Sequence, residues 1–371
     1  MRIGIDARLL ERKMTGIGRF LSNILKELPI IDNRNNYFLF SYDKLNNIDP
    51  YFNNVFTGNY LIHEKIFSPY WTNIILPEYL QRYKIDLYFS VNKILPYKKP
   101  SGVKYISVIH DVFYKIDSSF HSFVYRKYLD IFLKLSIRKS DLVITVSNNS
   151  KKDIIALFDV SESKIRVVHE AADDGFRPII LSDSEKEKLK TKYRLSDKFI
   201  LYVGVIENRK NIYAILKIAD LIYRDNKELK LLLIGRPGFG SKNILNEIKK
   251  RENVIHLKYV DDDTLKKLYS TARAFVFLSF YEGFGLPPLE AMQSGVPVLV
   301  SNSSSLPEVV DSGGILHNPG DYQSAYEDLM KLVKDETYYA LWRKRGLERA
   351  KYFSTKNTTK SIVEIFNSLG N

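Results

Sequence analysis

Short apolar runs alternate with amphipathic stretches along the first half of the chain. Patterns typical of buried strands occupy residues 2–6, 37–42, 86–90, 105–110, 141–146 and 165–169. After the first strand, apolar residues recur at helical spacing from Phe20 to Leu28, which predicts a helix. Further helices are expected at 119–139 and 148–158. Strands alternating with helices predict βαβ units and a mostly parallel sheet.

The alternation pauses and then resumes in the second half. Residues 178–196 are polar and charged and show no strand pattern, so we expect a domain junction near 178–195. Strand patterns return at 199–204, 229–235, 254–257, 274–279, 297–301 and 314–318. The pattern therefore predicts two α/β domains, residues 1–180 and 195–353, with ligands at the carboxyl ends of the strands in a cleft between them.

Composition narrows the choice of protein class. The 371 residues contain no cysteine, which excludes disulfides, thiolate metal sites and cysteine nucleophiles. No apolar run approaches the roughly 18–20 residues of a membrane span, and Asp6 and Arg8 interrupt any signal-peptide core. We expect a cytoplasmic protein, or one peripheral on a membrane. A net charge of +13, spread over both halves, favours anionic partners: nucleotides, anionic lipids or nucleic acid.

Two short motifs in the first half are candidate binding residues. Gly16 and Gly18 stand at the start of the first helix, where backbone N–H groups attract an anion, although Leu21 replaces the last glycine of a dinucleotide fingerprint. A simple glycine-rich turn is equally compatible with the spacing. His110 and Asp111 follow an apolar strand, so the histidine could donate a hydrogen bond to a substrate oxygen, or serve structure alone.

Two motifs in the second half are stronger candidates for a ligand-binding site. Arg209 and Lys210 lie near a strand end. Arginine offers a planar guanidinium with paired N–H donors and lysine a compact positive charge, and both suit a diphosphate. Glu282 follows a strand, and Glu290 lies about one turn into a helix expected from Leu286. The two carboxylates can reach different parts of one elongated ligand. The N–H groups of Gly283, Phe284 and Gly285 would meet an anion there.

An acidic triplet, Asp261-Asp262-Asp263, resembles the Asp-x-Asp pattern that holds a metal in some sugar-transfer enzymes. It immediately precedes a helical run, and aspartates at a helix start cap free N–H groups. We therefore favour capping over metal binding.

Taken in order, these motifs resemble those of the family 4 glycosyltransferases. The resemblance rests on TGIGRF near the N-terminus, SVIHDVFY at 107–114, ITVSNNSKKDI at 144–154, YVGVIENRKNI at 202–212, the E-x7-E segment at 282–290 and PVLVSNSSSLPEVVDSGGILHNPGD from 297. It implies the GT-B fold, two Rossmann-like domains facing across a cleft, with a C-terminal helix at 354–371 crossing back to the first. It also implies a retaining reaction without a metal.

The resemblance further implies roles for the motif residues. Arg209 and Lys210 would hold the donor diphosphate, and Glu290 the ribose hydroxyls. Glu282 and the residues after it would contact the transferred sugar or its phosphate. In the first domain, Gly16 and Gly18 would close over the phosphates, and His110 would line the site beside the sugar. The residues implied at the donor, in chain order, are Gly16, Gly18, Arg209, Lys210, Glu282, Gly283, Phe284, Gly285, Leu286 and Glu290, and those implied in catalysis are His110, Arg209, Lys210 and Glu282.

Two departures from the family pattern stand out. Many relatives have arginine where this chain has Val205, and many have an asparagine–glycine turn where it reads HEAADDGF at 169–176. Roles for Glu170 and Asp173 therefore stay open.

The TGIGRF and IENRKN segments resemble bacterial members that use GDP-mannose, while UDP-sugars and dTDP-rhamnose remain alternatives. Residues 68–83 and 118–140 mix aromatic and basic side chains at roughly helical spacing. Such a face could rest on an anionic membrane and receive a lipid-linked glycan. Alternatively, the apolar side packs in the core and the basic side is solvated.

Other classes remain open on the sequence. A nucleic-acid-binding protein would explain the basic charge, although no nucleic-acid motif appears and the charge is not clustered. A glycoside hydrolase would use the two glutamates, and a phosphorylase or epimerase would share the GT-B fold.

Overall fold

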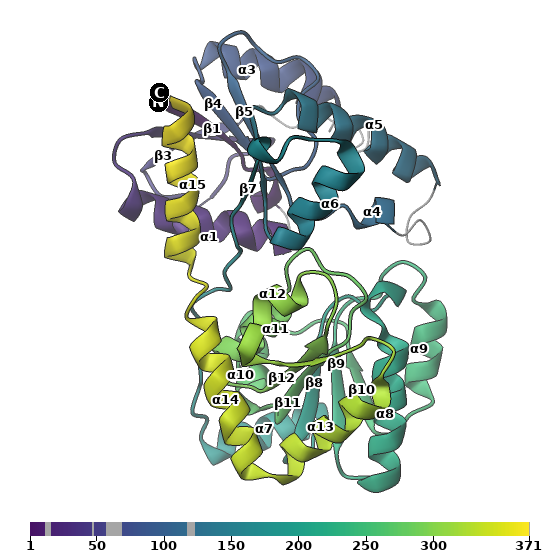
Figure 1. Ribbon diagram of the computed structural model, residues 1–371. Coiled ribbons are helices and arrows are strands. Elements are labelled where there is room, and N and C mark those ends of the chain that lie inside the picture. The colour runs from purple at the N-terminus through teal and green to yellow at the C-terminus, as the bar shows by residue number, and fades with distance from the viewer. Residues whose placement is uncertain (12–15, 47, 57–68, 117–122, 371) are drawn as a thin grey trace. The chain divides into compact units, whose positions relative to one another are not determined.

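The computed structural model describes residues 1–11, 16–46, 48–56, 69–116 and 123–370. The described chain divides into two compact units (Figure 1). The first unit combines the residues up to Ala171 with the C-terminal stretch from Thr355, and the second runs Ala172–Ser354. Among the described residues, every helix falls short of the length and hydropathy that a membrane-crossing segment needs.

The described residues of the first unit form a sheet of seven strands, all paired in parallel, in the order β3-β2-β1-β4-β5-β6-β7. Its strands are β1 (Arg2–Asp6), β2 (Asn36–Ser41), β3 (Phe52–Phe56), β4 (Leu87–Ser90), β5 (Lys104–Ile109), β6 (Leu142–Thr145) and β7 (Ile165–Val167). The strand order reverses between β1 and β4. In an open α/β sheet, side chains that follow the two strands at such a reversal flank the usual ligand site.

Helices cover both faces of this sheet (Figure 1). They are α1 (Gly16–Ile31), a π-helical turn η2 (Trp71–Ile75) leading into α3 (Leu76–Arg82), α4 (Phe113–Ile116), α5 (Phe123–Lys139), α6 (Asn148–Phe158) and α15 (Thr355–Gly370), with short 3₁₀ turns η1 (Arg8–Glu11) and η4 (Glu162–Lys164). Because strand residues alternate between faces, Ile3 and Ile5 pack with α1 and α15, while Tyr88 and Tyr105 pack with α3 on the other face.

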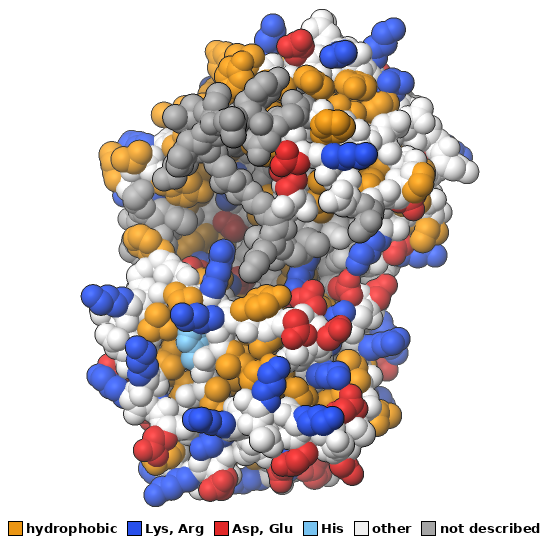
Figure 2. Space-filling model, turned by 180° about the vertical axis from the view of Figure 1, so that it is seen from behind, with side chains coloured by type: hydrophobic (Ala, Val, Ile, Leu, Met, Phe, Trp, Pro, Cys, Tyr) orange, Lys and Arg blue, Asp and Glu red, His pale blue; other side chains and the backbone are white. Residues whose placement is uncertain are grey.

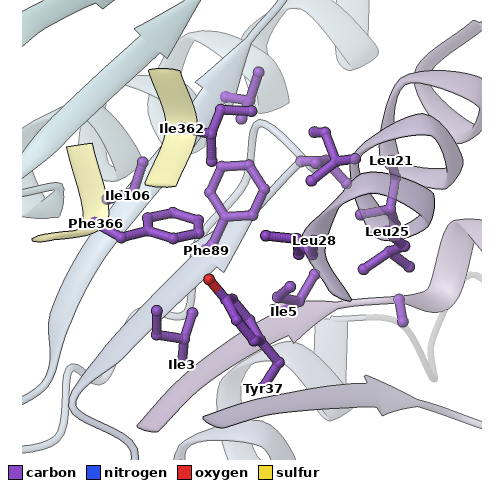
Figure 3. Packing of buried hydrophobic residues seen from close by; sticks show 14 of the residues in the cluster. Ile3, Ile5, Leu21, Leu25, Leu28, Tyr37, Phe89, Ile106, Ile362 and Phe366 are labelled. Atoms are coloured by element: carbon purple, nitrogen blue, oxygen red, sulfur yellow. The ribbon is translucent and has the colours of Figure 1, made fainter. Parts of the chain in front are cut away.

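The last helix of the chain, α15, is part of the first unit. Figure 3 shows Ile362 and Phe366 of α15 pointing into the apolar core beside Phe89 and Tyr37. The ring of Phe366 is fully buried and meets that of Phe89 edge-on, with 5.2 Å between centroids. The predicted return of the C-terminal helix to the first domain is therefore confirmed.

The second unit repeats the architecture. Its described strands are parallel and run in the order β10-β9-β8-β11-β12-β13. They are β8 (Phe199–Val203), β9 (Lys230–Ile234), β10 (Val254–Leu257), β11 (Ala274–Phe277), β12 (Val298–Ser301) and β13 (Ile315–His317). The helices are α7 (Asp183–Tyr193), α8 (Ile212–Asp225), α9 (Lys242–Lys249), α10 (Asp262–Thr271), α11 (Leu286–Gln293), α12 (Leu306–Val310), α13 (Tyr322–Lys334) and α14 (Glu336–Ala350), with 3₁₀ turns η5 (Asn208–Lys210) and η6 (Asp311–Gly313). Here the strand order reverses between β8 and β11.

The boundary between the units lies after Ala171, ahead of the junction expected at 178–195. Phe176 already packs edge-on against Tyr269 of the second unit, at 5.5 Å. The polar stretch that suggested a linker is helix α7, whose start is fixed by a capping box between Ser182 and Glu185. Its residues are mostly solvent-exposed, so the helix carries no apolar stripe for a sequence pattern to reveal.

The strands expected from the sequence are all present, and one further strand was missed. Strand β3 carries Asn53 and Asn54 at its centre and buries only Phe52 and Val55. An edge strand has one free side, so it tolerates polar residues that weaken the apolar pattern.

We expect Phe366→Ala to lower the free energy of unfolding of the first unit by about 3–5 kcal/mol, because it removes a buried ring and leaves a cavity. Denaturant unfolding followed by circular dichroism measures this. Glu364→Ala, on the exposed side of the same helix, is the matched control. Equal stability of the two variants would contradict the packing role of α15.

Candidate functional site

The loop after β8 is held in place by the loop after β9. The N–H groups of Gly204 and Ile206 donate to the carbonyls of Ile234 and Arg236, each at 2.9 Å. Gly235 makes this approach possible, because a Cβ at that position would lie 1.8 Å from the carbonyl oxygen of Gly204. The backbone leading to Arg209 and Lys210 is therefore fixed by the sheet.

Three predicted site residues meet at the strand reversal of the second unit. Lys210 Nζ donates to both oxygens of Glu282, at 2.6 and 2.8 Å, and Arg209 Nη1 donates to Glu282 Oε2 at 3.2 Å. Arg209 also donates through Nε to Glu207 at 3.0 Å. The N–H of Phe280, after β11, donates to the carbonyl of Arg209 and so ties the two loops together. Two cations and two carboxylates form one compact cluster.

Burial and charge act in opposition on the central pair. Burial alone would raise the pKa of the Glu282 carboxyl, but Lys210 and Arg209 hold that pKa below its usual value. Burial lowers the pKa of Lys210, and Glu282 opposes this effect. With Lys210 7% and Glu282 7% exposed, each charge depends on its partner for stabilisation.

The turn that carries Glu282 leads into α11. The hydroxyl of Ser304 accepts from the N–H of Glu282 at 2.8 Å, and the hydroxyl of Ser305 donates to the carbonyl of Glu282 at 3.0 Å. Gly285 has φ +127°, a conformation that other residues rarely adopt, and a Cβ there would lie 2.8 Å from Leu306. Helix α11 begins at Leu286, as predicted, so the N–H groups of Gly283–Gly285 stand at its positive end.

Two other predicted residues of this segment contact side chains outside the ionic cluster. Glu290 is buried in α11 and accepts a hydrogen bond from the hydroxyl of Tyr269 at 2.9 Å. The ring of Phe284 is 4% exposed and packs edge-on against Phe353 at 5.6 Å. Phe284 can therefore offer a ligand its backbone, whereas its side chain serves the core.

The remaining predicted residues belong to the first unit. Gly16 is the first residue of α1 and Gly18 is the third, within the first turn, while Thr15 of the same motif falls outside the described residues. His110 follows β5 directly, as expected. Its Nδ1 lies 2.7 Å from Oε1 of Glu170, with side chains 12% and 7% exposed, and the ring of Phe20 stands edge-on at 5.3 Å.

A carboxylate can only accept, so the contact with Glu170 places a hydrogen on Nδ1 of His110. Within the described chain, Nε2 of His110 is buried without a hydrogen-bond partner. The ring is thus held through Nδ1, and Nε2 has no hydrogen-bond partner among the described residues.

The acidic triplet caps a helix, as predicted. Asp261 is the N-cap of α10 and accepts from the N–H of Thr264 at 2.8 Å. Among the residues that the structure describes, no three histidine, aspartate or glutamate side chains gather as a metal site requires.

Comparison with known proteins identifies the family of the chain. Residues 14–176 match the family model described as Glycosyltransferase Family 4, and residues 183–349 match the model described as Glycosyl transferases group 1. The O-antigen chain mannosyltransferase B of Escherichia coli is 33% identical over 288 residues, which cover 76% of this chain and 74% of that protein. The chain belongs to the family 4 glycosyltransferases.

Other relatives of this glycosyltransferase share parts of their length with it. The serotype-specific mannosyltransferase WbdA of E. coli is 30% identical over 72% of this chain, which spans only 34% of that protein. The O-antigen chain mannosyltransferase RfbU of Salmonella typhimurium is 32% identical over 60% of each chain.

Solved structures confirm the fold of the glycosyltransferase. Sucrose-phosphate synthase from Thermosynechococcus elongatus covers 99% of this chain, and the chain covers 98% of it, with a TM-score of 0.78 at 17% identity. The glycosyltransferase WaaG covers 98% of this chain, which covers 99% of it, with a TM-score of 0.75 at 14% identity. The predicted GT-B class, with two Rossmann-like domains, is confirmed.

Two carboxylates that touch the predicted residues were given no role from the sequence. Glu170 holds His110, and Glu207 holds Arg209. Glu207 stands two positions before Arg209, so its proximity was visible in the sequence. Glu170 is 60 residues from His110, and only the pairing of the parallel strands brings them together.

We expect replacement of Glu170 by leucine to lower the transfer rate of the glycosyltransferase at least about tenfold, because His110 loses its fixed orientation. Glu170→Gln keeps an acceptor for Nδ1 and should retain most of the rate. Steady-state kinetics over a range of pH, with thermal unfolding of each variant, provides the measurement. Glu162→Gln, an exposed carboxylate of the same unit, is the control. Equal losses in the leucine and glutamine variants would contradict a positioning role.

Proposed function

We propose that the protein is a retaining mannosyltransferase that moves mannose from GDP-mannose to a glycan or lipid-linked acceptor during cell-surface polysaccharide synthesis. Relatives at 30–33% identity are named O-antigen or serotype-specific mannosyltransferases, which supports the sugar and the pathway class. The observation that carries the proposal is the cluster of Arg209, Lys210 and Glu282 at a strand reversal, beside the N-terminus of α11.

In this proposal the second unit binds the donor. Lys210 and Arg209 face the diphosphate, and Glu282 keeps both cations in place until the donor arrives. The backbone of Gly283, Phe284, Gly285 and Leu286 contacts the sugar or its phosphate, where the N-terminus of α11 favours negative charge. Glu290 contacts the ribose.

In the first unit, the start of α1 at Gly16 and Gly18 closes over the phosphates. The free Nε2 of His110 contacts the transferred sugar.

The reaction breaks the bond between the sugar's anomeric carbon and the β-phosphate oxygen, and forms a bond from that carbon to an acceptor hydroxyl oxygen. Negative charge develops on the leaving GDP, and fixed cations there stabilise the transition state. The acceptor attacks the face from which GDP departs, and its proton passes to the departing phosphate. Since all the charge stabilisation comes from protein groups, we propose that no metal is required.

A thermal-shift panel with GDP, UDP and dTDP and their sugars tests the donor. A ligand that binds only the folded protein raises its melting temperature, so GDP-mannose should give the largest shift.

Lys210→Met should reduce transfer at least about a hundredfold, with the fold retained by circular dichroism. EDTA should leave the rate of the unaltered enzyme unchanged. Near-normal transfer by the variant, or a larger shift with UDP- or dTDP-sugars, would contradict these assignments.

We also propose that the protein acts in the cytoplasm and rests on an anionic membrane through α5. Phe123, Val124 and Ile131 are exposed on this helix, alongside Lys127 and Lys134. Apolar side chains flanked by cations suit an anionic lipid surface. Of the segments 68–83 and 118–140 singled out in the sequence, residues 68 and 118–122 lie outside the described chain.

The partner we propose is a membrane and not nucleic acid. On the face shown in Figure 2, basic and acidic side chains are interspersed, whereas a nucleic-acid site gathers cations into one patch.

Vesicle co-sedimentation tests the membrane contact. The protein should bind vesicles containing phosphatidylglycerol more strongly than vesicles of phosphatidylcholine, and Phe123→Ala with Ile131→Ala should weaken binding about tenfold or more. Tyr213→Ala, an exposed ring of the second unit, is the control. Equal binding by the double variant would contradict the proposal.

A further inference from the structure

Ser304 has a backbone conformation that its place in the fold does not explain. Its φ is +52°, in the left-handed region that disfavours residues with a Cβ. The other described residues that combine a side chain with such a φ lie at or just after the end of a helix or 3₁₀ turn, where the conformation is common: Lys84, Asp159, Arg194, Asn211 and Asp311. Ser304 instead lies between β12 and α12. A strained residue beside a candidate site indicates a task for its side chain.

The serines after β12 bind the backbone of the turn after β11. Three of them donate hydroxyl hydrogens to carbonyl groups of that turn: Ser301 to Ser279 and Ser303 to Phe280, each at 2.5 Å, and Ser305 to Glu282 and Phe284, at 3.0 and 2.5 Å. Ser304 differs from them, because its hydroxyl accepts from the N–H of Glu282. Ser304 and Ser305 therefore hold the two polar backbone groups of one residue, Glu282.

The left-handed conformation makes this set of contacts possible. Consecutive side chains of an extended segment point to opposite sides. Three consecutive hydroxyls, those of residues 303–305, nevertheless reach the same turn. The backbone must bend between them, and the positive φ of Ser304 is part of this bend.

The backbone of Glu282 determines where the ionic cluster forms. The carboxylate of Glu282 receives Lys210 at 2.6 and 2.8 Å and Arg209 at 3.2 Å. A shift of the Glu282 backbone would move the oxygens that both cations contact. Misplacing a reacting or charge-stabilising group by about 1 Å can lower a rate about a hundredfold.

We propose that Ser304 is a positioning residue for the transfer reaction, held in the left-handed conformation so that its hydroxyl fixes the N–H of Glu282. This inference rests on the proposed role of Glu282 in the reaction. It separates two effects at one position, because the strained backbone acts on stability and the hydroxyl acts on the rate.

Two substitutions distinguish the hydroxyl from the strain. Ser304→Gly removes the hydroxyl and relieves the conformation, so the melting temperature should stay within about 2 °C while the rate falls about tenfold or more. Ser304→Thr keeps the hydroxyl but adds a branch at Cβ, so the melting temperature should fall by about 2–4 °C and the rate stay within about threefold. The rate is that of GDP release from GDP-mannose by the full chain, with methyl α-mannoside as the acceptor.

Arg194→Gly is the matched control. Arg194 is exposed at the end of α7 and has nearly the same φ, +55°. Its replacement relieves the same conformation away from Glu282, so the rate should not change.

A double-mutant cycle shows whether Ser304 acts through Glu282. Glu282→Gln alone should lower the rate, and adding Ser304→Gly should lower it no more than about threefold further, because the two residues serve one interaction. Hydrogen exchange of the peptide covering residues 280–286 gives a readout that does not depend on activity. Exchange there should be faster in Ser304→Gly and unchanged in Ser304→Thr and Arg194→Gly.

The outcomes separate this inference from the proposed function. A full rate in Ser304→Gly, equal losses in the glycine and threonine variants, or an undiminished loss in the Glu282→Gln background would overturn the positioning role alone. A full rate in Glu282→Gln by itself would contradict the role of Glu282 and this inference with it. If the unaltered protein releases no GDP, the donor assignment is wrong and hydrogen exchange decides the positioning role, which unchanged exchange in Ser304→Gly would overturn.

Discussion

The buried contact between Lys210 and Glu282 is the constraint on which the second unit's site depends. Each charge is almost fully removed from water, a condition that costs several kcal/mol per ion unless a partner compensates. The compensation requires both loops to be positioned within a few tenths of an ångström, and the sheet provides this by placing β8 beside β11. Gly235 and Gly285 also help to position the loops, because a Cβ at either position would clash with a neighbouring segment.

The first unit repeats this solution with different chemistry. Its strand order also reverses beside the first strand, and a buried ion pair, Asp6 with Arg8, again stands at the reversal. In the second unit the carboxylate is shared by two cations, whereas here one carboxylate offsets one arginine and receives an amide. At each reversal a buried carboxylate thus holds cationic side chains in place. The strands set the positions of these groups, and the loops that follow the strands set their chemistry.

Much of this arrangement was open to prediction, and the failures have physical causes. Buried parallel strands are continuous apolar runs, so β8 and β11 could be located from their residues alone. The glycine–proline context of 283–288 predicted a helix beginning near Leu286, and α11 begins there. Three features were not predicted from the sequence: the polar edge strand β3, the solvent-exposed helix α7 and the contact between His110 and Glu170. None leaves a local apolar pattern, because each depends on solvent exposure or on partners distant in sequence.

The position of α15 has a consequence for how the chain is made. Helix α15 fills the core that β1 begins, so the first unit stays incomplete until residues 355–370 have been synthesised. The second unit, whose residues are contiguous from Ala172, can close earlier. A ribosome that stalls before Thr355 would release a product with an open apolar groove over β1 and β4, a surface prone to aggregate and to be captured by chaperones.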